Sequence, residues 1–405
     1  MVGRGGRGAA TGMPDSEREE LLREALHAMH HWPVRASEPA RTRELLVVTL
    51  EGELSLAMLF SDRHDERCEL VLDAEARVRA QSDPDPVLLA RVLLNARPAK
   101  TAPHLLTERL ADSRQVLAVP AELLSDETRV AALAYVHEDL LRLGDRAGSR
   151  WHLADARRAA DRIGHPFWQW ATTTWSSLDL VIDGRLDDAE RLLAASLRDE
   201  QAASEAAACL AVQLTDIRLF QGRAGEVLEP MIGAVAANPA IPCYRAVLAL
   251  VASEAGRTVV AEEHYGWFRD AGFDALPEDS NRFLGLAVLG DVAADLHDAP
   301  GARLLTELLL PYADQQVVLN CYGGGGAYWG PTARILGRLA LVAGDDGAAA
   351  VWFASARERA LAFGAPLAAA RVDRDAACAA RQSTRRASTS PSSSITPVGT
   401  KPSRS

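Results

Sequence analysis

The sequence has almost no lysine. Lys100 and Lys401 are the two lysines among 44 basic residues, so the other 42 are arginine. A phosphate-binding loop of the GxxxxGK[ST] type needs a lysine directly after a glycine, and neither lysine follows one. This rules out a P-loop nucleotide site within the chain. The formal net charge of -11 also makes a direct nucleic-acid partner unexpected, because binding to a phosphate backbone needs clustered positive charge.

Cysteine is sparse and widely spaced, and no CxxC pair occurs. We therefore expect small, buried, reduced side chains rather than disulfides or metal ligands. Long apolar runs are absent as well, so no membrane span is predicted. No apolar segment follows Arg4 and Arg7, which argues against a signal peptide and predicts a cytoplasmic protein. The five cysteines are Cys68, Cys209, Cys243, Cys321 and Cys378.

The residues that are abundant favour helix. Hydrophobic residues make up 48% of the chain and aromatics only 5%, which is typical of a soluble helical protein. We divide the chain into a Gly/Arg-rich disordered leader at 1–15, an irregular helical part at 16–142, a repeat region at 143–382 and a disordered Ser/Thr/Pro-rich tail at 383–405. Helices are predicted in the irregular part at 16–31, 43–60, 64–80, 85–96, 104–117 and 125–142.

A repeat is the most informative pattern in the sequence. Residues that close a helix recur 34 to 47 residues apart, at Gly144, Gly184, Gly222, Gly256, His297 and Gly344. Five residues after each marker stands Ser149, Ala189, Val227, Ala261, Ala302 or Ala349. A small residue at that place lets the second helix of a hairpin approach the first closely. The pattern predicts an all-α fold, a tetratricopeptide-like right-handed α-solenoid of stacked antiparallel helix hairpins.

Three segments of the sequence are candidates for sites of chemistry. His27 and His31 share a helix face and could hold a metal, but with no HExxH pattern or nearby cysteine they are interpreted as partly exposed helix histidines. The glycine-rich stretch 322–329 could let a ligand approach its backbone; we favour an inter-helix loop that leads into a helix from about residue 328. The aromatic residues of 165–175 could anchor a ligand, but their helical spacing favours the core. No catalytic, cofactor-binding or metal-binding residue is predicted, and no cofactor.

Two segments resemble a recurring helical unit of actinobacterial multidomain regulators. These are 165–191, HPFWQWATTTWSSLDLVIDGRLDDAER, and 321–371, which begins CYGGGGAYWG. They are similar to the C-terminal tetratricopeptide-like region of proteins that carry a signal-transduction NTPase module, with a nucleotide cyclase or a LuxR-type helix-turn-helix in some relatives. The resemblance implies a helical sensor or protein-interaction array. The abrupt change of composition after residue 382 leads us to expect a fragment of a larger regulator.

These observations predict a non-enzymatic helical scaffold or sensor that binds a protein or a small effector in transcriptional or signalling regulation. The alternative is that the chain shares the ATPase, adenylate cyclase or LuxR-type DNA-binding activity of longer relatives. In stacked hairpins the first helix of each pair lines the concave face. Those first helices are predicted at 165–183, 204–221, 240–255, 281–296 and 328–343. The predicted partner-binding residues on this face are Gln169, Thr173, Gln213, Asp216, Arg245, Arg282 and Arg334.

Overall fold

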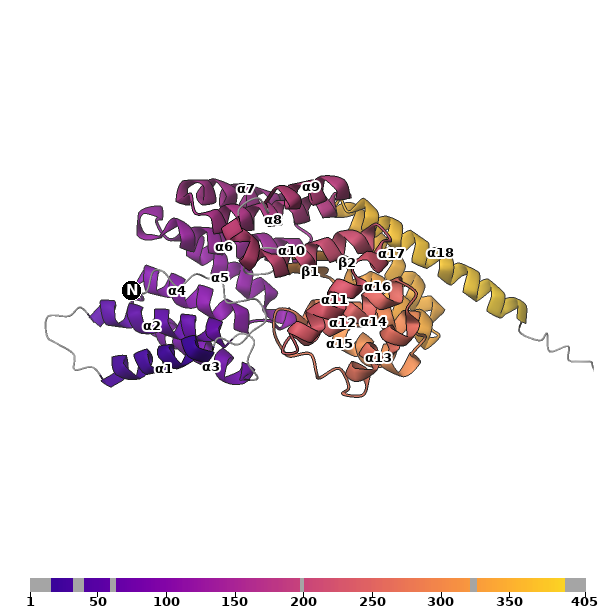
Figure 1. Ribbon diagram of the computed structural model, residues 1–405, viewed down its shortest axis with the longest axis horizontal. Helices are drawn as coiled ribbons and strands as arrows, with labels where there is room; N and C mark the ends of the chain where they lie inside the picture. Colours follow the sequence, from indigo (N-terminus) through magenta and orange to yellow (C-terminus); the bar gives the residue numbers. More distant parts are fainter. Residues whose placement is uncertain (1–15, 32–39, 59–62, 197–199, 321–325, 390–405) are drawn as a thin grey trace, which may run out of the picture.

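The computed structural model of the protein is helical over 80% of its length and has 3% strand, so the all-α prediction is confirmed. The predicted leader 1–15 and the stretch 321–325 lie outside the described residues. Figure 1 shows helices α1–α4 at one end, α5–α10 along the top, and α11–α17 below them at the other end. The structure describes residues 16–31, 40–58, 63–196, 200–320 and 326–389.

The predicted N-terminal helices all form, with ends that differ by only a few residues. Local sequence explains the ends. For example, the Asp85 side chain accepts hydrogen bonds from the backbone N–H groups of Val87 and Leu88, and Pro86 occupies the first helical position. These helices are α1 (Ser16–His31), α2 (Ala40–Ala57), α3 (His64–Arg79), α4 (Pro86–Ala96), α5 (Leu106–Ala118) and α6 (Asp126–Leu143).

The repeat region continues as antiparallel neighbours. Helix α6 packs on α7, α8 on α9, α12 on α13, α14 on α15 and α16 on α17. The helices after α6 are α7 (Arg146–Ile163), α8 (Pro166–Ile182), α9 (Leu186–Ser196), α10 (Glu200–Phe220), α11 (Leu228–Ala237), α12 (Pro242–Glu254), α13 (Thr258–Arg269), α14 (Arg282–Asp295), α15 (Ala299–Leu309), α16 (Thr332–Ala343), α17 (Asp346–Ala362) and α18 (Pro366–Thr389). Short 3-10 turns are η1 (Arg97–Ala99), η2 (Pro103–Leu105), η3 (Ala121–Leu123), η4 (Ala224–Glu226) and η5 (Leu310–Tyr312).

The predicted helix-closing residues have the expected left-handed backbone. Gly144 has a φ of 82°, and its N–H donates to the carbonyl of Leu141 while that of Asp145 donates to Leu140. His297 replaces glycine in one unit and adopts the same conformation, with a φ of 54°. A β-carbon is strained there, so the turn is set by the surrounding helices rather than by residue preference. The other four predicted glycines also have positive φ.

The residues predicted to lie where the helices of a hairpin cross are all buried. Each lies five residues after its marker, on the second helix or at its start, and each is buried. A larger side chain at these positions would separate the two helices of the hairpin, because packed interiors leave no spare volume. The buried crossing residues are Ser149, Ala189, Val227, Ala261, Ala302 and Ala349.

A β-hairpin replaces part of a predicted helix. Strand β1 (Gln316–Asn320) pairs antiparallel with β2 (Gly326–Pro331), and Val318 lies opposite Tyr328. The prediction of a helix starting near residue 328 is therefore wrong, since α16 begins only at Thr332, after the extended Pro331. The β-branched run in β1 and the adjacent aromatic residues of β2 suit a buried strand pair better than a helix end.

This hairpin lies inside the helical array. In Figure 1 the two strands are near the centre, between the upper layer of helices and α11–α17. Strand β1 contacts α6 and α14, and β2 contacts α8, α10, α16, α17 and α18. Every residue of β2 is buried. The concave surface predicted to receive a partner is thus covered, over these helices, by the chain itself.

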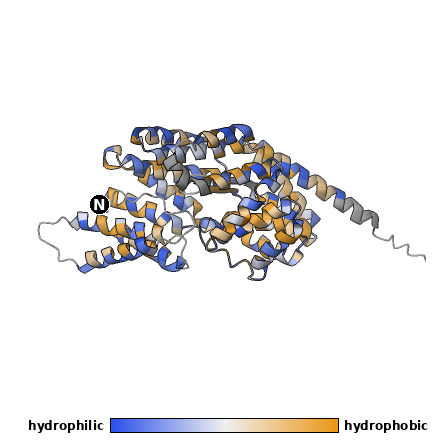
Figure 2. Ribbon diagram, in the orientation of Figure 1, coloured by the Kyte–Doolittle hydropathy of each residue, from blue (hydrophilic) through white to orange (hydrophobic). Residues whose placement is uncertain are grey.

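The tryptophans of the aromatic segment that was predicted to belong to the core are buried. Trp168, Trp170 and Trp175 are buried, as the helical spacing of the aromatic segment indicated. Figure 2 shows hydrophilic residues along the outer sides of the helices and hydrophobic residues toward their neighbours. No helix within the described ranges combines the length and apolar character needed to cross a membrane.

Two predictions need correction. Of the three cysteines whose side chains the structure describes, only Cys243 is buried; Cys68 is half-buried and Cys378 is exposed. The Ser/Thr/Pro-rich tail was expected to be disordered from residue 383, but α18 continues to Thr389. The last turns of α18 contain Ala, Arg, Ser and Thr without proline, so nothing in their sequence stops a helix that has already formed.

Candidate functional site

The structure buries three of the seven predicted partner-binding residues. Gln213, Asp216 and Arg334 are only 1%, 3% and 2% exposed. The Gln213 amide donates to the carbonyl of Thr174 at 2.7 Å, and Asp216 accepts from the backbone N–H of Tyr328 at 3.1 Å. The prediction that these side chains face a partner on an open groove is wrong, because β2 and its neighbours cover them.

The other four predicted residues stay at least partly accessible but do not form one site. Gln169 is exposed, and the Thr173 hydroxyl donates to its carbonyl at 2.8 Å. Arg245 stacks on the ring of Trp267 at 4.8 Å. Arg282 forms an ion pair with Glu278 at 3.0 Å. These residues come from three helices, α8, α12 and α14, and these contacts do not bring them together.

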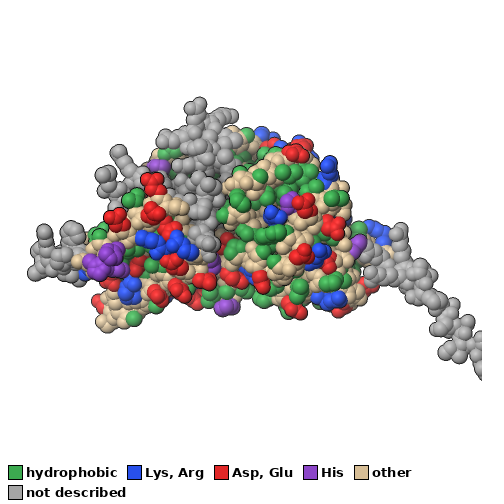
Figure 3. Space-filling model, turned by 60° about the horizontal axis from the view of Figure 1, so that its bottom comes forward, with side chains coloured by type: hydrophobic (Ala, Val, Ile, Leu, Met, Phe, Trp, Pro, Cys, Tyr) green, Lys and Arg blue, Asp and Glu red, His purple; other side chains and the backbone are tan. Residues whose placement is uncertain are grey.

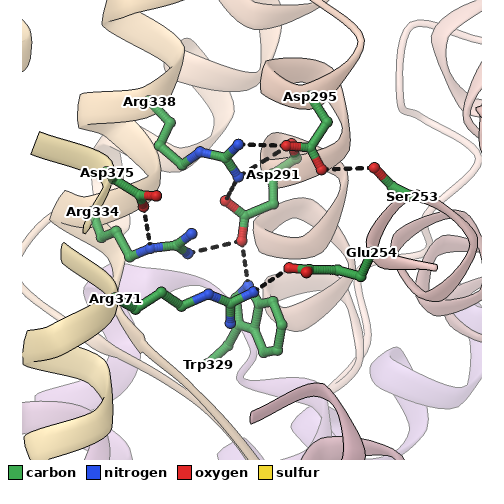
Figure 4. Close-up of polar contacts among 9 residues, drawn as sticks. All are labelled: Ser253, Glu254, Asp291, Asp295, Trp329, Arg334, Arg338, Arg371 and Asp375. Atoms are coloured by element: carbon green, nitrogen blue, oxygen red, sulfur yellow. Dashed lines mark hydrogen bonds and ion pairs between the residues drawn. The ribbon is translucent and has the colours of Figure 1, made fainter. Parts of the chain in front are cut away.

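Beneath β2 lies a cluster of charges centred on Asp291 of α14, which we call the Asp291 cluster (Figure 4). The Asp291 carboxylate accepts from Arg334 Nη1 at 2.9 Å, from Arg338 Nη1 at 2.6 Å and from Trp329 Nε1 at 2.5 Å. Burial alone would raise the pKa of Asp291, but the charges of Arg334 and Arg338 hold it well below its usual value.

The arginines of the Asp291 cluster have carboxylate partners from several helices. Arg334 Nε lies 2.7 Å from Asp375 of α18, and Arg338 Nη2 lies 2.5 Å from Asp295 of α14. Arg371 of α18 contacts Glu254 of α12 at 2.6 Å, and its guanidinium lies 3.8 Å from the centre of the Trp329 ring. Since every guanidinium has a carboxylate partner, the cluster joins α12, α14, α16, α18 and β2 and acts as a structural element.

A second group of acids resembles a metal site but already contains a cation. Glu75, Glu108 and Asp112 bring their carboxylates within reach of one ion. The Lys100 ammonium lies between them, at 2.8, 2.9 and 2.7 Å. One of the two lysines therefore occupies the centre of this group. His27 and His31, the histidine pair on the first helix, are exposed, and their ring centroids lie 4.3 Å apart.

The candidate site is a cavity where the N-terminal helices meet the C-terminal half of the chain. It has a volume of about 60 Å3, and we call it the junction cavity. One wall comes from η1, α5 and α6, and the other comes from the 278–282 segment, α14 and η5. Hydrogen bonds join the two walls: Thr101 Oγ1 donates to the carbonyl of Glu278 at 3.0 Å. Its principal lining residues are Arg97, Arg109, Tyr135, Arg142, Phe283 and Tyr312.

Most charges at the junction cavity are paired. Asp139 accepts from Arg97 at 2.8 Å and from Arg109 at 2.6 Å, and Glu138 lies 3.2 Å from Arg97. Arg142 differs: its Nε and Nη2 both donate to the amide oxygen of Gln315, at 3.2 and 3.0 Å. Burial, and secondarily the charge of Arg109, lower the pKa of Arg142 to about 10, so it remains protonated at neutral pH.

Aromatic rings complete the cavity. Phe283 and Tyr312 stack with their ring centroids 4.3 Å apart, and the Arg142 guanidinium lies 4.8 Å from the centre of the Phe283 ring. The Arg97 guanidinium lies 4.1 Å from the centre of the Tyr135 ring. The arrangement can bind a small polar ligand between flat apolar walls.

Of the seven residues predicted from the sequence, only Arg282 lines the junction cavity. The sequence does contain a signal for other residues at the cavity. Helix α6 is buried along its length yet contains His137, Glu138, Asp139 and Arg142. Charged side chains in an otherwise apolar helix must be paired or must face a polar space, so this run could have marked the site.

Comparison of the sequence with models of known protein families gives no match, and comparison with curated proteins gives none either.

Proposed function

We propose that this chain is a non-enzymatic tetratricopeptide-like right-handed α-solenoid that serves as a sensor in transcriptional or signalling regulation, and that its effector binds in the junction cavity. The observation that carries the proposal is the junction cavity itself, which is lined by residues from both halves of the chain. A ligand held there contacts both walls at once, so its binding stabilises their association.

Two further observations support a small effector over a long peptide. The hairpin β1–β2 covers the inner side of α6, α8, α10 and α14, where a groove-binding peptide would otherwise lie. On the face drawn in Figure 3, acidic and basic side chains are interspersed over the described residues, and they form no continuous basic area of the kind a polyanion requires. The proposal therefore rests on an internal cavity instead of an outer surface.

The way in which neighbouring helix pairs contact one another supports a regulatory role. Five adjacent helix pairs, from α6–α7 to α16–α17, share a left-handed turn and, in their second helix, a buried small residue. Units of this kind contact mainly their neighbours, so a change in one contact propagates along the array. A ligand that joins α6 to α14 would connect units that are far apart in the sequence.

The test is a panel of chemically distinct compounds offered to the purified full chain. The panel consists of propionate, inorganic phosphate, MgATP, spermidine and glucose. We expect one chemical class to raise the thermal unfolding midpoint, and we expect mass spectrometry to recover every compound unchanged. Conversion of any compound would show an enzyme, and the absence of stabilisation by all five would contradict the effector-binding role.

A further inference from the structure

One buried arginine at the junction cavity has no carboxylate partner. Arg142 is 5% exposed and lines the cavity, yet it forms no ion pair within the described ranges. Its Nε and Nη2 share one neutral acceptor, the Gln315 amide oxygen, and its Nη1 donates no hydrogen bond there. Burying a guanidinium costs free energy that a neutral amide oxygen offsets only in part. The position is therefore prepared for an anion.

The surrounding charges limit how many negative charges the anion carries. Arg97 and Arg109 are already neutralised by Asp139 and Glu138. Arg282, on the opposite wall, pairs with Glu278. Of the four arginines that line the cavity, Arg142 is left without a carboxylate partner within the described ranges, and Asp279 is a third acidic lining residue beside Glu138 and Glu278. A phosphate dianion would bring a second negative charge close to Glu138 and Glu278, which also line the cavity.

The size of the junction cavity and the residues that line it also favour a small anion with one negative charge. A cavity of about 60 Å3 holds a few water molecules or a small organic group. Phe283, Tyr312 and Tyr135 provide flat apolar surface beside the guanidinium. A planar carboxylate accepts two parallel hydrogen bonds from a guanidinium, and a short apolar tail would lie against the rings.

We propose that the junction cavity binds a small monocarboxylate whose carboxylate pairs with Arg142, displacing or sharing the hydrogen bonds of Gln315. This inference rests on the proposed function, because it names the chemical class of the effector. The amide oxygen of Gln315 already occupies the position that one oxygen of the ligand's carboxylate would take. Its Nε2 donates to the carbonyl of Pro103 at 3.4 Å. The ligand would thus contact α6 and the segment before β1 together.

The experiment is calorimetric titration of the full chain with propionate, with propionamide as the neutral isostere and inorganic phosphate as the dianion. We expect propionate to bind at least about tenfold more tightly than either. Equal binding of propionamide would overturn the inference, because the charge of Arg142 would then have no role. Tighter binding of phosphate would overturn the choice of a monocarboxylate.

Two substitutions of Gln315 test where the ligand binds while Arg142 stays in place. In Gln315→Glu a carboxylate of the chain itself faces Arg142, so propionate affinity should fall at least about tenfold. In Gln315→Met the shared acceptor is gone, and affinity should be kept or increased. Arg129→Gln is the matched control, because Arg129 lies on the same helix but pairs with Asp155 at 3.0 Å away from the cavity. Unchanged affinity in Gln315→Glu, with the fold intact by circular dichroism, would overturn the site.

The outcomes also separate this inference from the proposed function. If another member of the panel binds and its affinity is unchanged in Gln315→Glu, the effector role stands and the carboxylate site does not. If neither propionate nor any other member of the panel binds, both are contradicted.

Discussion

The Asp291 cluster and the junction cavity are both buried and both rich in arginine, but they balance charge differently. In the Asp291 cluster each guanidinium has a carboxylate within ion-pair distance, and Asp291 alone serves two of them. At the junction cavity Arg142 has no carboxylate at ion-pair distance within the described ranges, and its guanidinium donates to the amide oxygen of Gln315. Full pairing indicates a structural role, and an unpaired buried charge beside a cavity indicates a binding role.

The largest expected effect comes from breaking the balanced cluster. Asp291→Asn removes the carboxylate shared by Arg334 and Arg338 and leaves two buried guanidinium groups without adequate compensation. We expect a loss of about 3–5 kcal/mol in the free energy of unfolding, measured by urea denaturation.

The matched control is Asp295→Asn, which removes a partly exposed partner of Arg338 and should cost less than about 1 kcal/mol. Equal losses for the two substitutions would mean that burial does not distinguish the shared carboxylate.

The buried carboxyl group of Asp216 makes the free energy of unfolding depend on pH. Burial raises the pKa of Asp216 to about 7, despite its hydrogen bond from Tyr328 N–H and the nearby charge of Arg371. The folded state then binds more protons than the unfolded state between about pH 4 and pH 7, so this group lowers stability as pH rises through that range.

Asp216→Asn keeps an acceptor for Tyr328 and cannot ionise. We expect it to stabilise the protein at pH 8 by on the order of 2–4 kcal/mol, and to leave stability near pH 4 almost unchanged. Urea unfolding at the two pH values is the measurement. A gain of the same size at both would show that ionisation of Asp216 is not the cause.

A smaller effect would sharpen the comparison at the junction. Gln315→Glu gives Arg142 the carboxylate that it lacks, and we expect a gain of about 1 kcal/mol at neutral pH without ligand. The gain should disappear when Arg142 is replaced by methionine, which a double-mutant cycle measures. A gain that persists in the Arg142→Met background would arise from another contact.

The part of the fold that the sequence predicted is local. Helix-closing positions such as Gly144 and small crossing residues such as Ala189 act within one hairpin, so their spacing is readable from the chain. The hairpin β1–β2 was missed because it is stabilised by distant helices, and its Val/Leu and glycine residues also fit a loop and helix locally.

The candidate site was missed for the same reason. Arg142 and Gln315 are 173 positions apart, and Thr101 and Glu278 are 177 apart. No local pattern states which charged residue of α6 finds a partner and which does not. Predicting exposure from helix faces also failed for Gln213 and Arg334, since it assumed an open inner surface that the hairpin fills.

The most direct measurement compares two buried arginines in matched substitutions, Arg142→Met and Arg334→Met, by urea unfolding in the absence of ligand. Removing Arg142 eliminates a buried charge that has no ion-pair partner within the described ranges, so the free energy of unfolding of this variant should stay within about 1 kcal/mol of the parent. Removing Arg334 leaves Asp375 without its ion-pair partner and Asp291 with Arg338 and Trp329 alone, and should cost about 2–4 kcal/mol. Equal losses in the two variants would contradict the distinction between a structural cluster and a binding site.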